Sequence, residues 1–115
     1  MRAAADELLT AFARSDLEVI ARRCADHVVV WGTDEGESWN GKEDVLASFA
    51  GAFDLEVRWA SEPLEGRDWL AGTAQFGLAD GSSVLARVTM VFGEGLLEHA
   101  HYSIPVARRA PAPGA

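Results

Sequence analysis

The chain has 115 residues, a formal net charge of −8 and a composition that is 49% hydrophobic and 24% charged. This length predicts one domain with a single core, and the excess of acids argues against partners such as nucleic acids or anionic membranes. The single cysteine excludes an internal disulfide and a cysteine-based zinc cluster. No signal-peptide pattern follows Met1, and no apolar run is long enough to span a membrane, so we expect a cytoplasmic protein.

Two helices are predicted at the start of the chain. Apolar residues recur at helical spacing from Ala3 to Arg14. Ser15 to Glu18 then reads as a capping box, with Ser15 as the N-cap of a second helix that closes at Asp26–His27. Cys24 falls on the apolar face of that helix, where it is interpreted as a small buried side chain and not as a nucleophile.

A strand, an acidic loop and a third helix follow. The β-branched run at 28–33 is typical of a strand. The loop 34–38 holds three acids, but their spacing fits no calcium loop, and a solvated loop is the preferred interpretation. Asp34 lies just past the strand end and between two tryptophans, where its carboxylate could overhang a cavity mouth. The third helix is predicted over about 42–53.

From residue 55 onward the hydrophobic period changes to two. Strands are predicted over 55–59, 68–78, 83–92 and 96–104, with an Asp-Gly hairpin turn at 79–82. We expect these elements to form one domain over residues 1–106, followed by a flexible tail at 107–115. Helices gathered on one side of an antiparallel sheet make an α+β domain, and such a sheet, when curved, leaves a hollow in which a site can form.

The order of these elements resembles the nuclear transport factor 2-like superfamily, which includes ketosteroid isomerase, and the SnoaL-like proteins most closely. The resemblance covers residues 3–106. Its motifs are Ser15-Asp16-Leu17-Glu18, Ala25-Asp26-His27-Val28, Gly32-Thr33-Asp34-Glu35-Gly36-Glu37, Trp39-Asn40-Gly41-Lys42-Glu43, Arg87-Val88-Thr89 and His101-Tyr102-Ser103-Ile104-Pro105. It implies a cone-shaped fold in which three N-terminal helices pack on a strongly curved antiparallel sheet.

The steroid isomerase machinery itself is not implied. Registering the chain on Ser15-Asp16-Leu17 places Leu8 at the catalytic tyrosine of ketosteroid isomerase, Gly32 at its base and about Val88 at its second acid. None of these side chains can polarise a carbonyl or move a proton.

The segment His99-x-His101-x-Ser103 also resembles the last strand of the association (hub) domain of calcium/calmodulin-dependent kinase. That match implies that the sides bearing Tyr102 and Met90 face the pocket. It also implies that the opposite sheet face, with Arg87, Thr89 and His101, forms a homodimer. A register shift of one residue would exchange the two faces.

Candidate site residues follow from this arrangement. Glu98 is the first candidate for a pocket acid, since an apolar cone would raise its pKa. The alternative is an edge carboxylate paired with Arg87 or Arg58. The catalytic candidates are Glu98, Asp34 and Tyr102, with His99 and His101 as alternates, and the ligand-binding candidates are Trp31, Trp39, Phe53, Trp59, Met90 and Phe92.

No metal site and no cofactor are predicted. His99 and His101 share a strand face, but no nearby motif supplies a third ligand, so structural or interface histidines are the preferred interpretation.

The sequence leaves two predicted functions open. In the first, the domain binds a small hydrophobic molecule, carbonyl compounds included, and acts as a lyase, isomerase or cyclase. Glu98 or Asp34 would then serve as the base, and Tyr102 or a histidine would donate a hydrogen bond to the oxyanion. In the second, the domain is a non-catalytic dimeric binding or assembly module.

Overall fold

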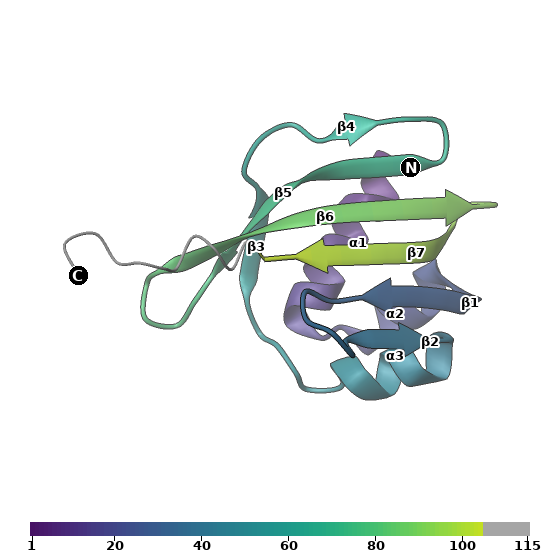
Figure 1. Ribbon diagram of the computed structural model, residues 1–115, viewed down its shortest axis with the longest axis horizontal. Helices are drawn as coiled ribbons and strands as arrows, with labels where there is room; N and C mark the ends of the chain where they lie inside the picture. Colours follow the sequence, from purple (N-terminus) through teal and green to yellow (C-terminus); the bar gives the residue numbers. More distant parts are fainter. Residues whose placement is uncertain (105–115) are drawn as a thin grey trace.

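The structure is a computed structural model that describes residues 1–104. It contains three helices and seven strands (Figure 1). In chain order these are α1 (Arg2–Arg14), α2 (Leu17–Arg23), β1 (Cys24–Trp31), β2 (Ser38–Asn40), α3 (Lys42–Phe49), β3 (Glu56–Trp59), β4 (Leu64–Glu65), β5 (Trp69–Gly77), β6 (Ser83–Gly93) and β7 (Leu96–Ser103). The predicted domain boundary at residue 106 and the predicted tail at 107–115 lie outside the described residues.

All seven strands belong to one curved, open sheet. Its order is β2-β1-β7-β6-β5-β3, and β4 pairs with β5 beside this path. The helices lie together behind the sheet in Figure 1, so the sheet has one covered and one uncovered face. The predicted α+β architecture is therefore confirmed, with one addition: β1 and β7 pair in parallel, whereas all other pairs are antiparallel.

The hydrophobic core lies between α1 and the covered face. Leu8 of α1, Leu70 of β5 and Leu97 of β7 are fully buried there, together with Met90 of β6. Burying each of these side chains contributes roughly 2 kcal/mol to folding. The core fills the part of the sheet where β5, β6 and β7 run side by side under α1.

The junction between the first two helices differs from the prediction. Ser15 adopts a left-handed conformation with φ 54° and ends α1, and the side chain of Asp16 caps α2 by accepting from the backbone N–H of Val19 at 3.3 Å. Ser15 has another use, because its hydroxyl accepts from the N–H of Phe53 at 2.9 Å. The predicted capping box was therefore wrong by one residue.

The second helix is also shorter than predicted. It ends at Arg23, and β1 begins at Cys24, which pairs with Leu97 of β7. Cys24 is buried, as predicted, and burial raises the pKa of its thiol from 9.0 to about 11, although nearby Lys42 opposes this shift. A thiol with so high a pKa stays protonated near neutral pH, so it is a poor nucleophile.

Two short strands were not predicted. Residues 38–40 form β2, which pairs with the end of β1, and residues 64–65 form β4. Strands this short carry too few residues to show an alternating pattern. Helix α3 ends at Phe49, four residues before the predicted end, and the chain turns at Gly51 with φ 65°.

Within residues 1–104, no helix is both long enough and apolar enough to cross a membrane.

Candidate functional site

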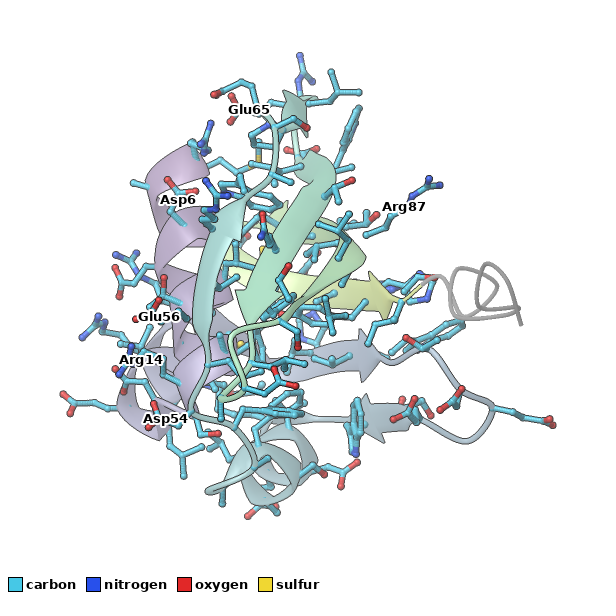
Figure 2. All side chains as sticks on the ribbon, turned by 90° about the vertical axis from the view of Figure 1, so that its left-hand side faces the viewer. Asp6, Arg14, Asp54, Glu56, Glu65 and Arg87 are labelled. Carbon is cyan, nitrogen blue, oxygen red and sulfur yellow. The ribbon has the colours of Figure 1, made fainter. Side chains whose placement is uncertain are left out.

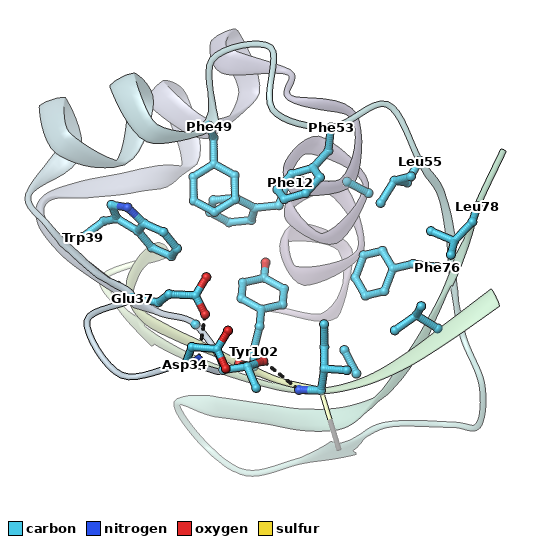
Figure 3. Close-up of a pocket in the computed structure, with 16 residues that line it drawn as sticks. Phe12, Asp34, Glu37, Trp39, Phe49, Phe53, Leu55, Phe76, Leu78 and Tyr102 are labelled. Carbon is cyan, nitrogen blue, oxygen red and sulfur yellow. Dashed lines mark hydrogen bonds between the residues drawn. The ribbon is translucent and has the colours of Figure 1, made fainter. Parts of the chain in front are cut away.

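A cavity of about 390 Å³ opens at one end of the covered sheet face. Pockets of this size accept small organic molecules. Figure 3 shows aromatic side chains from the helices on one side and the curved sheet on the other. The lining residues are Phe12, Ala13, Gly32, Thr33, Asp34, Glu37, Trp39, Phe49, Phe53, Leu55, Phe76, Leu78, Val84, Ala86, Tyr102 and Ile104.

Aromatic rings in mutual contact make the wall rigid. Phe49, at the end of α3, packs edge-on against Phe12 of α1 at 4.9 Å and against Trp39 of β2 at 5.4 Å between ring centroids. Phe53 lies 6.1 Å from Phe49. Such pairs each add about 1 kcal/mol beyond the area they bury. The wall is thus held in shape by its own contacts.

Tyr102 of β7 carries a polar group into this apolar space. Its ring contacts Phe12 edge-on at 5.8 Å between centroids, and Figure 3 shows the phenol pointing between the aromatic walls. The hydroxyl is buried and has no hydrogen-bond partner among the described residues. Burial raises the pKa of this phenol well above its ordinary value of 10.0. The group is therefore a neutral hydroxyl, available as a donor or an acceptor.

Two carboxylates enter the cavity from the loop between β1 and β2. The backbone N–H of Asp34 donates to Oε1 of Glu37 at 2.7 Å, and the N–H of Glu37 donates to the carbonyl oxygen of Asp34 at 3.0 Å. The N–H of Gly32 donates to the carbonyl oxygen of Glu37 at 2.7 Å. These bonds hold both acids at the cavity mouth. Asp34 is exposed there, and Glu37 is half-buried.

Four of the predicted site residues come together at this cavity. Asp34 and Tyr102 line it, as do Trp39 and Phe53. Trp39 points inward because it pairs with Val30, which is fully buried, and paired residues of an antiparallel ladder share a face.

Four predicted ligand-binding residues lie elsewhere. Trp31 follows the inward-facing Val30 and so points to the uncovered face, where it is 50% exposed. Trp59 is half-buried at the sheet edge and donates through its indole N–H to Oδ1 of Asp6 at 2.7 Å. Met90 and Phe92 do face inward, but they belong to the packed core. The cavity is bordered by the other end of β6, which holds Val84 and Ala86.

Glu98, the first candidate for a pocket acid, also lies outside the cavity. A β-bulge explains this placement. Val91 pairs with His99 and Phe92 with Leu97, so Glu98 is an extra residue on β7. Leu97 and Ala100, three positions apart, both point inward and are fully buried. Glu98 instead contacts Nε2 of His27 at 3.1 Å, which corrects its predicted place and its predicted partners, Arg87 and Arg58.

The two alternate catalytic candidates lie on the uncovered face. His99 and His101 flank the Trp31 ring at 5.7 and 6.3 Å between centroids. Within residues 1–104, no three His, Cys, Asp or Glu side chains gather as metal ligands.

Several cavity residues were missed by the sequence reasoning. Phe12 and Phe49 lie on the apolar faces of the predicted helices at 3–14 and 42–53, and helical spacing does not distinguish a residue packed under the sheet from one beside a cavity. Glu37 offered a usable signal: it lies two positions before Trp39, so in extended chain both share a side. Gly32, which the registration places at the catalytic base of ketosteroid isomerase, does line the cavity. Leu8 and Val88, placed at the catalytic tyrosine and the second acid, are buried in the core.

The SnoaL-like domain family matches this chain over residues 1–107. The chain belongs to this family. A comparison with curated proteins finds no match.

Solved structures with the same fold include a protein described as a putative ketosteroid isomerase from Kribbella flavida. It is 20% identical, with 96% of this chain and 81% of that chain covered and a TM-score of 0.79. A nuclear transport factor 2-like protein of unknown function from Burkholderia xenovorans is 17% identical, with coverage of 96% and 87% and a TM-score of 0.73.

A third structure is a hypothetical protein with a ketosteroid isomerase-like fold from Catenulispora acidiphila, in complex with trimethylamine. It is 10% identical, with coverage of 86% and 82% and a TM-score of 0.72. At these identities the likenesses show the fold. The predicted nuclear transport factor 2-like fold and SnoaL-like membership are thus confirmed.

Proposed function

We propose that this SnoaL-like domain binds a small, largely hydrophobic molecule in the aromatic cavity. The observation that carries the proposal is the Tyr102 hydroxyl, a buried polar group without a hydrogen-bond partner among residues 1–104, which lies between the aromatic walls of the cavity. Leaving such a group unsatisfied costs about 1–3 kcal/mol, and a ligand with a hydrogen-bonding atom would recover that cost. The trimethylamine complex of the Catenulispora protein supports a small-molecule ligand for this fold.

A thermal-shift screen of hydrophobic compounds tests this proposal. Ligands that bind only the folded state raise its stability by about 2.7 kcal/mol at a concentration 100 times the Kd, so binders will raise the melting temperature. The matched variant is Ala86→Phe, which fills the cavity from β6, with Val84→Phe as a replacement if the first does not fold. Binders that shift both proteins equally, or a screen without binders, would contradict the proposal.

Acid–base chemistry is a second candidate, favoured by a carboxylate and a neutral phenol that line one cavity. Asp34 would remove a proton next to a carbonyl, and Tyr102 would donate a hydrogen bond to the developing oxyanion. This chemistry fits a lyase, isomerase or cyclase.

The test for chemistry is exchange of α-protons for deuterium in bound carbonyl compounds, followed by NMR. We expect Asp34→Asn to slow exchange by about 100-fold or more and Tyr102→Phe to slow it by about 100- to 1000-fold. Exchange that is unchanged in Asp34→Asn would exclude this role.

A homodimeric binding or assembly module is the third candidate, and the uncovered sheet face favours it. Trp31, Leu85 and Trp69 are 50%, 44% and 42% exposed on this face. Arg87 and Thr89 lie between them, paired with Ser103 and His101 of β7, and Figure 2 shows Arg87 pointing away from the helices. The paired outward positions of β5, β6 and β7 hold no carboxylate, although the chain has a net charge of −8. A second copy of the chain would therefore meet little electrostatic repulsion on this face.

Light scattering at micromolar concentration tests the dimer. We expect twice the chain mass for the wild type and a monomer for Arg87→Glu/Thr89→Glu, because like charges would face each other across the two-fold axis. A monomeric wild type would exclude the module.

A further inference from the structure

The charges at the cavity are all of one sign. Among the described residues that line it, Asp34 and Glu37 are the only ionisable side chains apart from the Tyr102 phenol, and none is Lys, Arg or His. Among residues 1–104, neither carboxylate takes part in an ion pair, although Asp6, Glu7, Asp26, Asp54, Glu62 and Glu98 all do. Within residues 1–104, the mouth of the cavity therefore carries two carboxylates without a counter-charge.

The wall behind these carboxylates consists of π-faces and ring edges. Trp39 stands two positions after Glu37, on the same side of the chain, and packs against Phe49, which in turn packs against Phe12 and Phe53. A cation over the face of Trp, Tyr or Phe is attracted by the ring quadrupole, by up to about 2 kcal/mol when it is desolvated. Carboxylates at the rim of an aromatic pocket are the combination that selects cations.

The buried Tyr102 hydroxyl points to a ligand independently of the acids. Burial keeps it neutral, so it can accept a hydrogen bond from an N–H group or donate one to an acceptor. It adds a polar contact without adding a charge of either sign.

We propose that the ligand of this cavity is a hydrophobic ammonium compound, with its cationic nitrogen between the Asp34 and Glu37 carboxylates and the aromatic wall. The inference rests on the proposed binding function and not on acid–base chemistry. A neutral ligand would partly dehydrate half-buried Glu37 without compensation, and an anion would be repelled by both carboxylates. A cation compensates the two charges that have no ion-pair partner among residues 1–104.

Three probes of similar shape and different charge distinguish the effect of ligand charge on affinity from that of hydrophobic contact. They are trimethylanilinium, its neutral isostere tert-butylbenzene, and the anion 2-methyl-2-phenylpropanoate. NMR titration of the full chain, read on the backbone and indole signals, gives a Kd for each. We expect trimethylanilinium to bind at least tenfold more tightly than tert-butylbenzene, which is about 1.4 kcal/mol, and the anion at least tenfold more weakly than tert-butylbenzene.

Variants then assign the preference to the two acids. In Asp34→Asn/Glu37→Gln the affinity for trimethylanilinium should fall at least tenfold. The affinity for tert-butylbenzene should stay within threefold, because the amide oxygen introduced at position 37 can still accept from the backbone N–H of residue 34 and so keep the shape of the loop. The matched control is Glu35→Gln, which removes an exposed charge from the same loop but lies outside the cavity lining. It should change neither affinity by more than about twofold, in keeping with screening of an exposed charge.

The failures are distinguishable. If tert-butylbenzene binds as tightly as trimethylanilinium to the wild type, the ammonium preference is overturned and the binding function stands. If none of the three probes binds, both are overturned. The wild-type comparison decides even if the double variant does not fold.

Discussion

The two faces of the curved sheet differ in how they use the same kinds of side chain. On the covered face, aromatic rings contact each other around a hollow, and a buried hydroxyl and two carboxylates face into it. On the uncovered face, tryptophans lie open beside histidines and an arginine. A concave wall suits a molecule that it can surround, whereas an open face suits another protein surface.

The largest expected effect contrasts one aromatic residue from each face. Phe49→Ala removes a buried ring that contacts Phe12 and Trp39, and we expect it to lower the free energy of unfolding by about 3 kcal/mol. Trp31→Ala removes a half-exposed ring and should cost about 1 kcal/mol or less. Urea denaturation measures both. Equal losses would mean that the uncovered face is buried in solution, as in a homodimer.

The next effect is a pH dependence that originates at Cys24. Its pKa is raised from 9.0 to about 11, so the unfolded chain releases the thiol proton first and alkaline pH favours unfolding. The stabilisation is fully present below pH 9 and is lost as the pH rises toward 11.

We expect the wild type to lose roughly 2 kcal/mol more than Cys24→Ala between pH 8 and pH 10.5. Because Tyr102 is present in both proteins, its own titration largely cancels. Urea unfolding at the two pH values measures this difference, and parallel losses would mean that the thiol is not buried in solution.

A smaller effect of opposite sign is expected at Tyr102. Since its hydroxyl is buried without a partner among the described residues, Tyr102→Phe should raise the free energy of unfolding by about 1 kcal/mol in the absence of ligand. Thermal denaturation checks this. A loss of stability would show that the hydroxyl is already satisfied, and the main support for the binding site would fall.

The smallest effect tests the corrected position of Glu98. This carboxylate pairs with exposed His27, and such a pair contributes about 0.5 kcal/mol or less. We expect Glu98→Gln to change the free energy of unfolding by no more than this amount. The Kd for trimethylanilinium should change by no more than about twofold. A tenfold loss of affinity, matching that of the Asp34/Glu37 double variant, would return Glu98 to the site.

Much of the architecture was determined by the sequence alone. Helical and alternating periods predicted three helices and the long strands, because burial of one face imposes these periods directly. The resemblance to the hub domain, and not alternation, predicted that Tyr102 faces the pocket, and the place of Asp34 just past a strand end predicted a carboxylate at the cavity mouth. The outline of the fold and the position of Asp34 were therefore predictable from local pattern, whereas the face of Tyr102 came from the resemblance.

The tertiary structure decided what depends on pairing and depth. The bulge at Glu98 arises from the register between β6 and β7, which no single strand encodes. Met90 and Tyr102 both face inward, yet only the core end of the sheet is filled, since α1 and the paired strands meet there. Alternation shows which side a residue faces, but only packing among distant elements decides whether that side is solid or hollow.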